Sequence, residues 1–158
     1  MKAATISELK KELKTRPPQQ VEEICLRLAK FKKENKELLT YLLFEADNEE
    51  AYIESVKQEI EEQFATLNKS NLYIAKKMMR KILRNINKFI RYSGDKRTEV
   101  ELLIFYCNKM RRSGVPISRS TTLANIYHRQ VEKIKKTLAT MHEDLQFDFQ
   151  EEVEKLLR

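Results

Sequence analysis

Apolar residues recur at intervals of three and four positions along most of the chain, a spacing typical of amphipathic helices. The clearest example is the face shared by Ile53, Val56, Ile60, Phe64 and Leu67. The same spacing predicts a short helix after Thr5, a second opened by Pro18, others at 37–46, 71–92, 98–114 and 120–145, and a short one from 148. The sequence therefore predicts an all-α chain.

Short polar motifs set the expected helix boundaries. Thr98 and Glu101 have the spacing of a capping box, in which each side chain bonds the backbone of the other residue. Asn35 is expected to separate the second helix from the third. Gly94 is expected to take the left-handed conformation that ends the long helix before it. The apolar residues from 123 to 145 predict one continuous helix.

The two halves of the chain resemble each other. Shifted by 58 positions, residues 21–31 align with 79–89, and both segments end in the same aromatic residue. With a six-residue insertion, residues 37–41 align with 101–105. Any two amphipathic helices align on their apolar positions, so chance similarity is the alternative interpretation.

A real duplication predicts how the helices are organised. The whole chain, 1–158, is expected to form a single domain, with an internal repeat of 19–67 and 71–141. Each repeat is a three-helix unit, and the two would stack as a short armadillo- or HEAT-like superhelix. The comparison is one of architecture only, and an irregular helical bundle is the alternative. The apolar seams could also pack between chains, which would give a homo-oligomer.

Composition supports the prediction of a helical chain and indicates where in the cell the protein is expected. The chain has only two glycines and three prolines in 158 residues, too few for the turns of a β-sandwich or barrel. Cys25 and Cys107 lie within apolar helical patterns and are expected to be buried free thiols. The N-terminus lacks the apolar region of a signal peptide, and no apolar stretch approaches the ~20 residues of a transmembrane span. We therefore expect a cytoplasmic protein.

Motifs that carry chemistry are absent from the sequence. Nucleotide-binding loops and hydrolase elbows need glycines that this chain lacks. The only histidines, His128 and His142, occur in no spacing typical of a metal site. The carboxylates suit solvated helix faces and give no identifiable acid–base pair. We predict no catalytic residue, no cofactor and no metal, and hence a protein that is not an enzyme.

Charge is the most distinctive feature of the sequence. The formal net charge is +7, and residues 69–97 carry ten basic side chains against one acidic one. On a helical projection of residues 71–92, six basic side chains and one tyrosine share the side opposite the apolar face. We call this set the basic stripe; its members are Tyr73, Lys77, Arg80, Lys81, Arg84, Lys88 and Arg91.

The basic stripe has three interpretations. It could be a solvated face, neutralised by the acidic helix at 49–67. It could bind an acidic protein partner or an anionic surface, as basic amphipathic helices do. It could also bind nucleic acid through backbone phosphates, with Tyr73 stacking on a base. The sequence predicts a non-enzymatic interaction module that binds an acidic partner through the stripe, with sequence-nonspecific nucleic-acid binding as the alternative.

Overall fold

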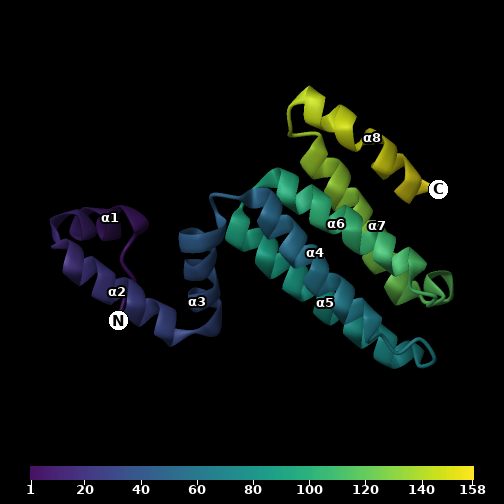
Figure 1. The fold of residues 1–158 in the computed structure, drawn as a ribbon, viewed down its shortest axis with the longest axis horizontal. Coiled ribbons are helices and arrows are strands. Elements are labelled where there is room, and N and C mark those ends of the chain that lie inside the picture. The colour runs from purple at the N-terminus through teal and green to yellow at the C-terminus, as the bar shows by residue number, and fades with distance from the viewer. The chain divides into compact units, whose positions relative to one another are not determined.

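A computed structural model describes residues 1–158 and contains eight α-helices and no β-strand (Figure 1). The prediction of an all-α chain is confirmed. The chain forms two compact units, residues 1–44 and 45–158, and each is described in turn. None of the helices combines the length and the apolar character that crossing a bilayer requires.

The first unit is built from three short helices. They are α1 (Ile6–Thr15), α2 (Pro18–Phe31) and α3 (Lys33–Thr40), followed by a single π-helical turn at Tyr41–Glu45. A capping box opens α1: the Thr5 backbone N–H donates to the Glu8 carboxylate at 2.7 Å, and the Glu8 N–H donates to the Thr5 hydroxyl at 3.3 Å. Pro18 opens α2, as predicted. Helices α2 and α3 pack against each other.

The predicted boundary at Asn35 is wrong, because Asn35 lies inside α3. The break falls at Lys32, whose backbone is extended (φ −142°, ψ 148°). From α3, the Asn35 side-chain amide donates a 2.8 Å hydrogen bond to the carbonyl oxygen of Leu28. That carbonyl is among the last four of α2, which have no partner within their own helix. Asn35 therefore ends α2 through its side chain rather than through its backbone.

The first unit has almost no buried core, because Tyr41 in the π-helical turn is its only buried residue. No residue of α1, α2 or α3 is buried. The apolar face predicted for the second helix exists, but it is open to solvent, and Phe31 is 77% exposed. Cys25 on this helix is exposed as well, so the expectation of a buried thiol holds for Cys107 only.

The second unit holds five α-helices joined by short turns, and consecutive helices run in alternating directions (Figure 1). They are α4 (Glu49–Ala65), α5 (Leu72–Ser93), α6 (Lys96–Arg112), α7 (Thr121–Leu138) and α8 (Glu143–Leu157), with a 3₁₀ turn at Ile117–Arg119 before α7. The five apolar residues that predicted the helix at 49–67 are all buried.

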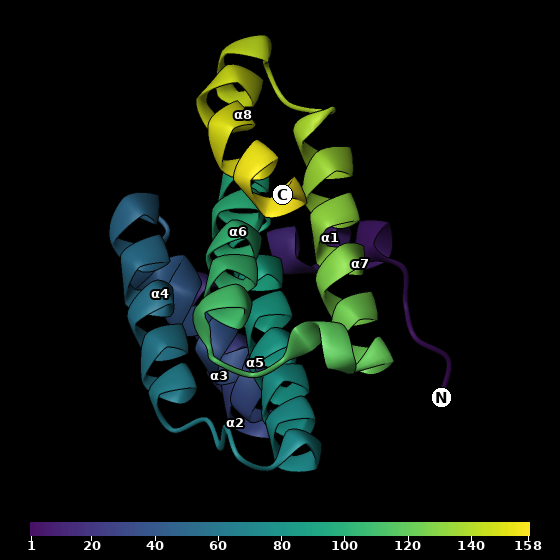
Figure 2. The ribbon, with the colours of Figure 1, turned by 90° about the vertical axis from the view of Figure 1, so that its right-hand side faces the viewer.

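Helix α6 forms the centre of the second unit (Figure 2). It packs against α4, α5, α7 and α8, and eight of its residues are buried, among them Tyr106 and Cys107. Each of the four surrounding helices turns an apolar face towards α6 and a polar face towards solvent. This arrangement is compatible with an irregular helical bundle.

Polar side chains begin most helices of the second unit. Asn48, Asn71 and Ser120 each accept a hydrogen bond from the backbone N–H three residues later, at the starts of α4, α5 and α7. Gly94 ends α5 with φ 68°, which confirms the predicted left-handed cap.

The capping box predicted for Thr98 and Glu101 is wrong. Asp95 caps α6 instead, accepting hydrogen bonds from the N–H groups of Arg97 and Thr98 at 2.7 and 3.1 Å. Thr98 is fully buried in the first turn, where its hydroxyl donates to the carboxylate of Glu49. An aspartate at the cap satisfies two backbone donors, so the helix begins before the threonine.

The continuous helix predicted to reach residue 145 is also wrong. Helix α7 ends at Leu138, and the Thr140 hydroxyl donates to the Thr137 carbonyl at 2.7 Å in the turn that follows. His142 then starts α8, with its Nδ1 accepting from the Asp144 N–H at 3.3 Å. The apolar spacing continued through a turn because α8 covers the same core as α7 from a second direction.

Candidate functional site

Helix α5 presents its two faces to different surroundings. Ala75, Met79, Ile82, Ile86 and Ile90 are buried on the side that packs against α4 and α6. The members of the basic stripe lie on the opposite side. Six of them are exposed: Tyr73, Lys77, Arg80, Lys81, Arg84 and Arg91. Lys88 is half-buried, and its ammonium lies 5.1 Å from the centroid of the Phe89 ring.

The acidic residues of α4 do not neutralise the exposed basic stripe. Glu54 pairs with Lys57 on its own helix, Glu50 with Arg97 at the start of α6, and Glu61 with Lys109 further along α6. The exposed cations of the stripe form no ion pair with any carboxylate; they are Lys77, Arg80, Lys81, Arg84 and Arg91. Their charge is therefore balanced only by solvent and counterions.

A groove of about 500 Å³ lies between α5 and α7. From α5 it is lined by Arg80, Leu83, Arg84 and Asn87. From α7 it is lined by Thr122, Asn125, Ile126 and Arg129. Three guanidinium groups, two carboxamides and a hydroxyl thus border one concave surface that contains no carboxylate. We call it the arginine groove.

Two of the stripe residues, Arg80 and Arg84, stand one helical turn apart on the edge of α5 that borders the arginine groove. The other basic side chains of the stripe extend the positive surface along α5, beyond the residues that line the groove. The stripe therefore has two parts. Arg80 and Arg84 form a groove edge that faces α7 across the arginine groove, and the remaining basic residues form an outer edge that lines no groove.

Sequence reasoning did not assign the α7 side of the groove to the site. In the sequence, Arg129 is one of several basic residues in the last third of the chain, with no spacing that sets it apart from the others. Of those, Lys133 is compensated by Glu99 at 2.6 Å, and Arg111 donates to the backbone carbonyl of Lys155. Arg129 forms no ion pair and borders the groove. Only the packing of α7 shows that Arg129 borders the groove, whereas Lys133, which also reaches α5, donates to Asn87 Oδ1 at 3.4 Å.

The chemistry of the arginine groove favours oxyanions. A guanidinium stays protonated throughout the accessible pH range and presents planar pairs of N–H donors, which match carboxylate and phosphate oxygens. The carboxamides of Asn87 and Asn125 supply further donors and acceptors. No cluster of histidine, cysteine or acidic side chains suited to holding a metal ion occurs in the structure.

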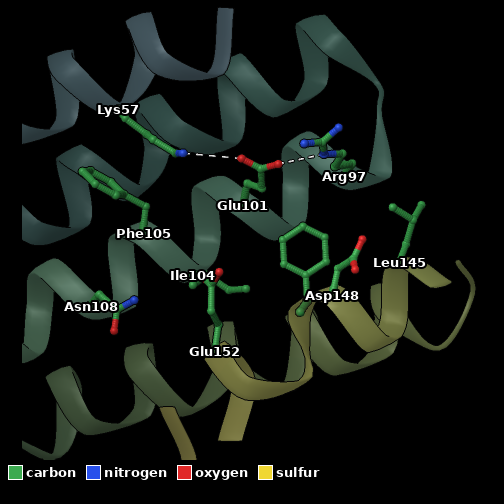
Figure 3. A pocket seen from close by; sticks show the side chains of 10 residues that line it. Lys57, Arg97, Glu101, Ile104, Phe105, Asn108, Leu145, Asp148 and Glu152 are labelled. Atoms are coloured by element: carbon green, nitrogen blue, oxygen red, sulfur yellow. Dashed lines mark hydrogen bonds and ion pairs between the residues drawn. The ribbon is translucent and has the colours of Figure 1, made fainter. Parts of the chain in front are cut away.

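A second cavity, of about 410 Å³, lies between α4, α6 and α8 (Figure 3). At its edge the Glu101 carboxylate accepts from the Lys57 ammonium at 3.4 Å and from Arg97 Nε at 2.8 Å. Partial burial lowers the pKa of Lys57, but its hydrogen bond to Glu54 and the charge of Glu101 outweigh that effect and raise the pKa overall. Because its cations are already compensated, this cavity is the weaker candidate for binding an anion.

The fold and the groove together define the class: an all-α protein with an uncompensated, arginine-lined groove on its second unit. No family model, curated protein or solved structure matches the chain.

Proposed function

We propose that the chain is a non-enzymatic interaction module that binds an acidic protein partner through the basic stripe and the arginine groove. The observation that carries the proposal is that Arg80, Arg84 and Arg129 converge on a groove without any carboxylate. A carboxylate of a partner would replace water there and form charge-assisted, bidentate hydrogen bonds. A cytoplasmic location belongs to the same proposal.

The outer edge of the basic stripe supports a partner larger than a single anion. From Lys77 to Arg91 the stripe advances 14 positions along the helix, or roughly 21 Å at 1.5 Å per residue. Exposed charges over such a length raise the association rate with an oppositely charged surface. The groove would then provide the specific contacts, and the outer edge would provide the long-range attraction.

Nucleic acid is the second candidate, favoured by one specific observation. Tyr73 is 73% exposed at the start of the stripe, where its ring could stack on an unpaired base. The guanidinium groups of the groove suit phosphates as well as carboxylates. Such binding would follow the backbone and would not depend on base sequence.

Fluorescence anisotropy with three labelled probes separates the two candidates: a 20-residue Glu/Asp-rich peptide, single-stranded RNA and duplex DNA. Binding of the peptide in preference to both nucleic acids supports the first candidate. Preference for RNA or DNA supports the second, and six phosphate contacts would reduce affinity on the order of a thousand-fold between about 50 and 200 mM salt.

Charge-matched variants locate the binding surface. The double variant Arg80→Glu/Arg84→Glu should abolish binding of the preferred probe. Lys10→Glu/Lys11→Glu changes the net charge by the same amount on α1, which contributes no residue to the groove, and should bind normally. Equal losses in both variants would mean that only net charge matters, and would contradict a specific site. The armadillo- or HEAT-like stacking and the internal repeat remain predictions on which the proposal does not depend.

A further inference from the structure

The first unit exposes large apolar side chains to solvent. They occur on each of its helices and in the π-helical turn, and they include Ile6 at 80%, Phe31 at 77% and Phe44 at 77% exposure. Contiguous apolar surface of this kind on a water-soluble chain commonly marks a site of interaction. Helices this short also gain most of their stability from packing their apolar faces rather than from intrinsic propensity.

The apolar surface is hollowed between α2 and α3. A groove of about 700 Å³ has an apolar floor made by Leu26, Ala29, Leu39, Leu43 and Phe44, with Thr40 as its only uncharged polar residue. Leu43 and Phe44, from the π-helical turn, are 62% and 77% exposed at its end. The groove lies entirely within residues 1–44.

Four lysines complete the lining of this groove: Lys30, Lys32, Lys33 and Lys36. Lys33 pairs with Glu37 at 3.5 Å, whereas the other three form no ion pair. No carboxylate lines the groove. The surface therefore combines an apolar floor with a positive rim in which three of the four lysines are uncompensated, and we call it the lysine-rimmed groove.

The rim determines which occupant fits. A second copy docking through the same groove would bring two sets of lysines together, and like charges at an interface oppose association. The arginine groove of the second unit differs in that its lining is mainly polar, so the two surfaces suit different ligands. The lysine-rimmed groove needs a ridge of apolar side chains with carboxylates on both flanks, which an acidic amphipathic helix provides.

We propose that the lysine-rimmed groove binds an amphipathic helix of a partner protein, with leucine- or phenylalanine-type side chains seated on Leu39, Leu43 and Phe44 and with acidic residues facing the lysines. The inference is independent of the function proposed for the arginine groove, because its residues lie in the other unit. An anionic lipid surface would satisfy the same charges, but it would not fill a concave floor. It is therefore an outcome of the test rather than the proposal.

The test uses the full chain and a labelled synthetic 18-residue helix with a leucine stripe flanked by glutamates. A matched helix with lysines in place of the glutamates is the first control, and vesicles of neutral and of anionic lipid are the second. The acidic helix should bind, as measured by fluorescence anisotropy, and the basic helix and both kinds of vesicle should not. Binding to anionic vesicles without binding to the acidic helix would overturn the proposal in favour of a lipid surface.

Variants on exposed positions then place the bound helix. Lys32→Glu/Lys36→Glu and, separately, Phe44→Ser should each weaken binding at least tenfold, whereas Lys10→Glu/Lys11→Glu should leave it unchanged. These variants are made and compared in a chain that already carries Arg80→Glu/Arg84→Glu, which removes the arginine groove as a second site for an acidic probe. Complete loss of binding in the Arg80→Glu/Arg84→Glu chain itself, or no further loss in the lysine-rim variant, would overturn the proposal. So would self-association of the chain, seen by analytical ultracentrifugation and removed by Phe44→Ser, because a second copy would then be the occupant.

Discussion

The hydroxyl of Tyr106 donates a 3.0 Å hydrogen bond to the backbone carbonyl oxygen of Met79 and thereby joins α6 to α5 inside the second unit. Both residues are fully buried. Two other tyrosines form the same kind of hydrogen bond between helices. The Tyr52 hydroxyl donates to the Phe89 carbonyl at 2.9 Å, and the Tyr127 hydroxyl donates to the Leu156 carbonyl at 2.8 Å. Buried tyrosines thus link α4 to α5, α5 to α6 and α7 to α8 by bonds that a phenylalanine could not make.

Replacing Tyr106 with phenylalanine should lower the free energy of unfolding by about 1 kcal/mol, the typical net value of one hydrogen bond. The ring stays, so packing against Phe64, whose ring centroid lies 5.9 Å away, is retained. Urea denaturation of Tyr106→Phe and of Tyr73→Phe gives the comparison, because the Tyr73 ring is exposed. Equal stability of the two variants would mean that the Tyr106 hydroxyl contributes nothing.

Stability should fall as the pH rises above about 9. Burial raises the pKa of the Cys107 thiol to about 12, and it raises the pKa of the neighbouring Tyr106 as well. An unfolded cysteine loses its proton near pH 8.5, so at higher pH the unfolded state binds fewer protons than the folded state and is favoured. Between the two pKa values, Cys107 alone costs about 1.4 kcal/mol of stability for each pH unit.

Urea denaturation at pH 8 and pH 10.5 checks this dependence. The free energy of unfolding should drop by at least about 2 kcal/mol between the two pH values. In Cys107→Ala the drop should be smaller, even though the variant starts from a lower stability because it leaves a cavity. The same drop in both proteins would show that Cys107 is not the group responsible.

Replacing Asp95 with alanine should destabilise the protein by about 1 kcal/mol, since the first turn of α6 would lose the acceptor for two backbone N–H groups. Asp95→Asn retains an oxygen in the same place and should cost much less. Thermal unfolding followed by circular dichroism compares the two. If both variants lost the same amount, the charge of Asp95 rather than its cap would stabilise α6.

The helices of the second unit were predictable because their apolar seams face one core. The spacing of the apolar residues from Ile53 to Leu67 was enough to predict their helix. The presence of Gly94 was enough to predict the left-handed cap. The predicted helix boundaries were wrong where a side chain forms a hydrogen bond to the backbone near a helix end. Asp95 outcompetes the Thr98 cap, and Asn35 bonds back to Leu28, neither of which changes the apolar spacing.

The sites were predictable only in part. Spacing on one helix placed Arg80 and Arg84 together, but the opposite wall, with Arg129, depends on how α7 packs on α6. In the first unit the amphipathic spacing correctly indicated apolar helix faces, such as the one carrying Phe31. It wrongly implied that the chain itself buries them, because amphipathicity shows which residues avoid water and not which partner removes them from it.

Neutralising the basic stripe should leave the fold as stable as before or make it more stable. Arg84 stands four residues from Arg80 and Lys88 and three from Lys81, so it takes part in three like-charge contacts on α5. Arg84→Gln removes all three and should raise the free energy of unfolding by up to about 1 kcal/mol, since each such contact costs a few tenths. Urea denaturation at low salt, where screening is weakest, should show the largest gain.

Lys57→Gln is the contrasting variant, because Lys57 is compensated by Glu54 and Glu101 and its side chain is only 23% exposed. Its loss should lower the free energy of unfolding by about 1 kcal/mol, as expected for a partly buried, hydrogen-bonded charge. A similar loss in Arg84→Gln would mean that the stripe stabilises the fold. If the free energy of unfolding instead rose in Arg84→Gln and fell in Lys57→Gln, the arginines of the stripe would lower the stability of the fold. That is expected where charged residues are retained for binding rather than for folding.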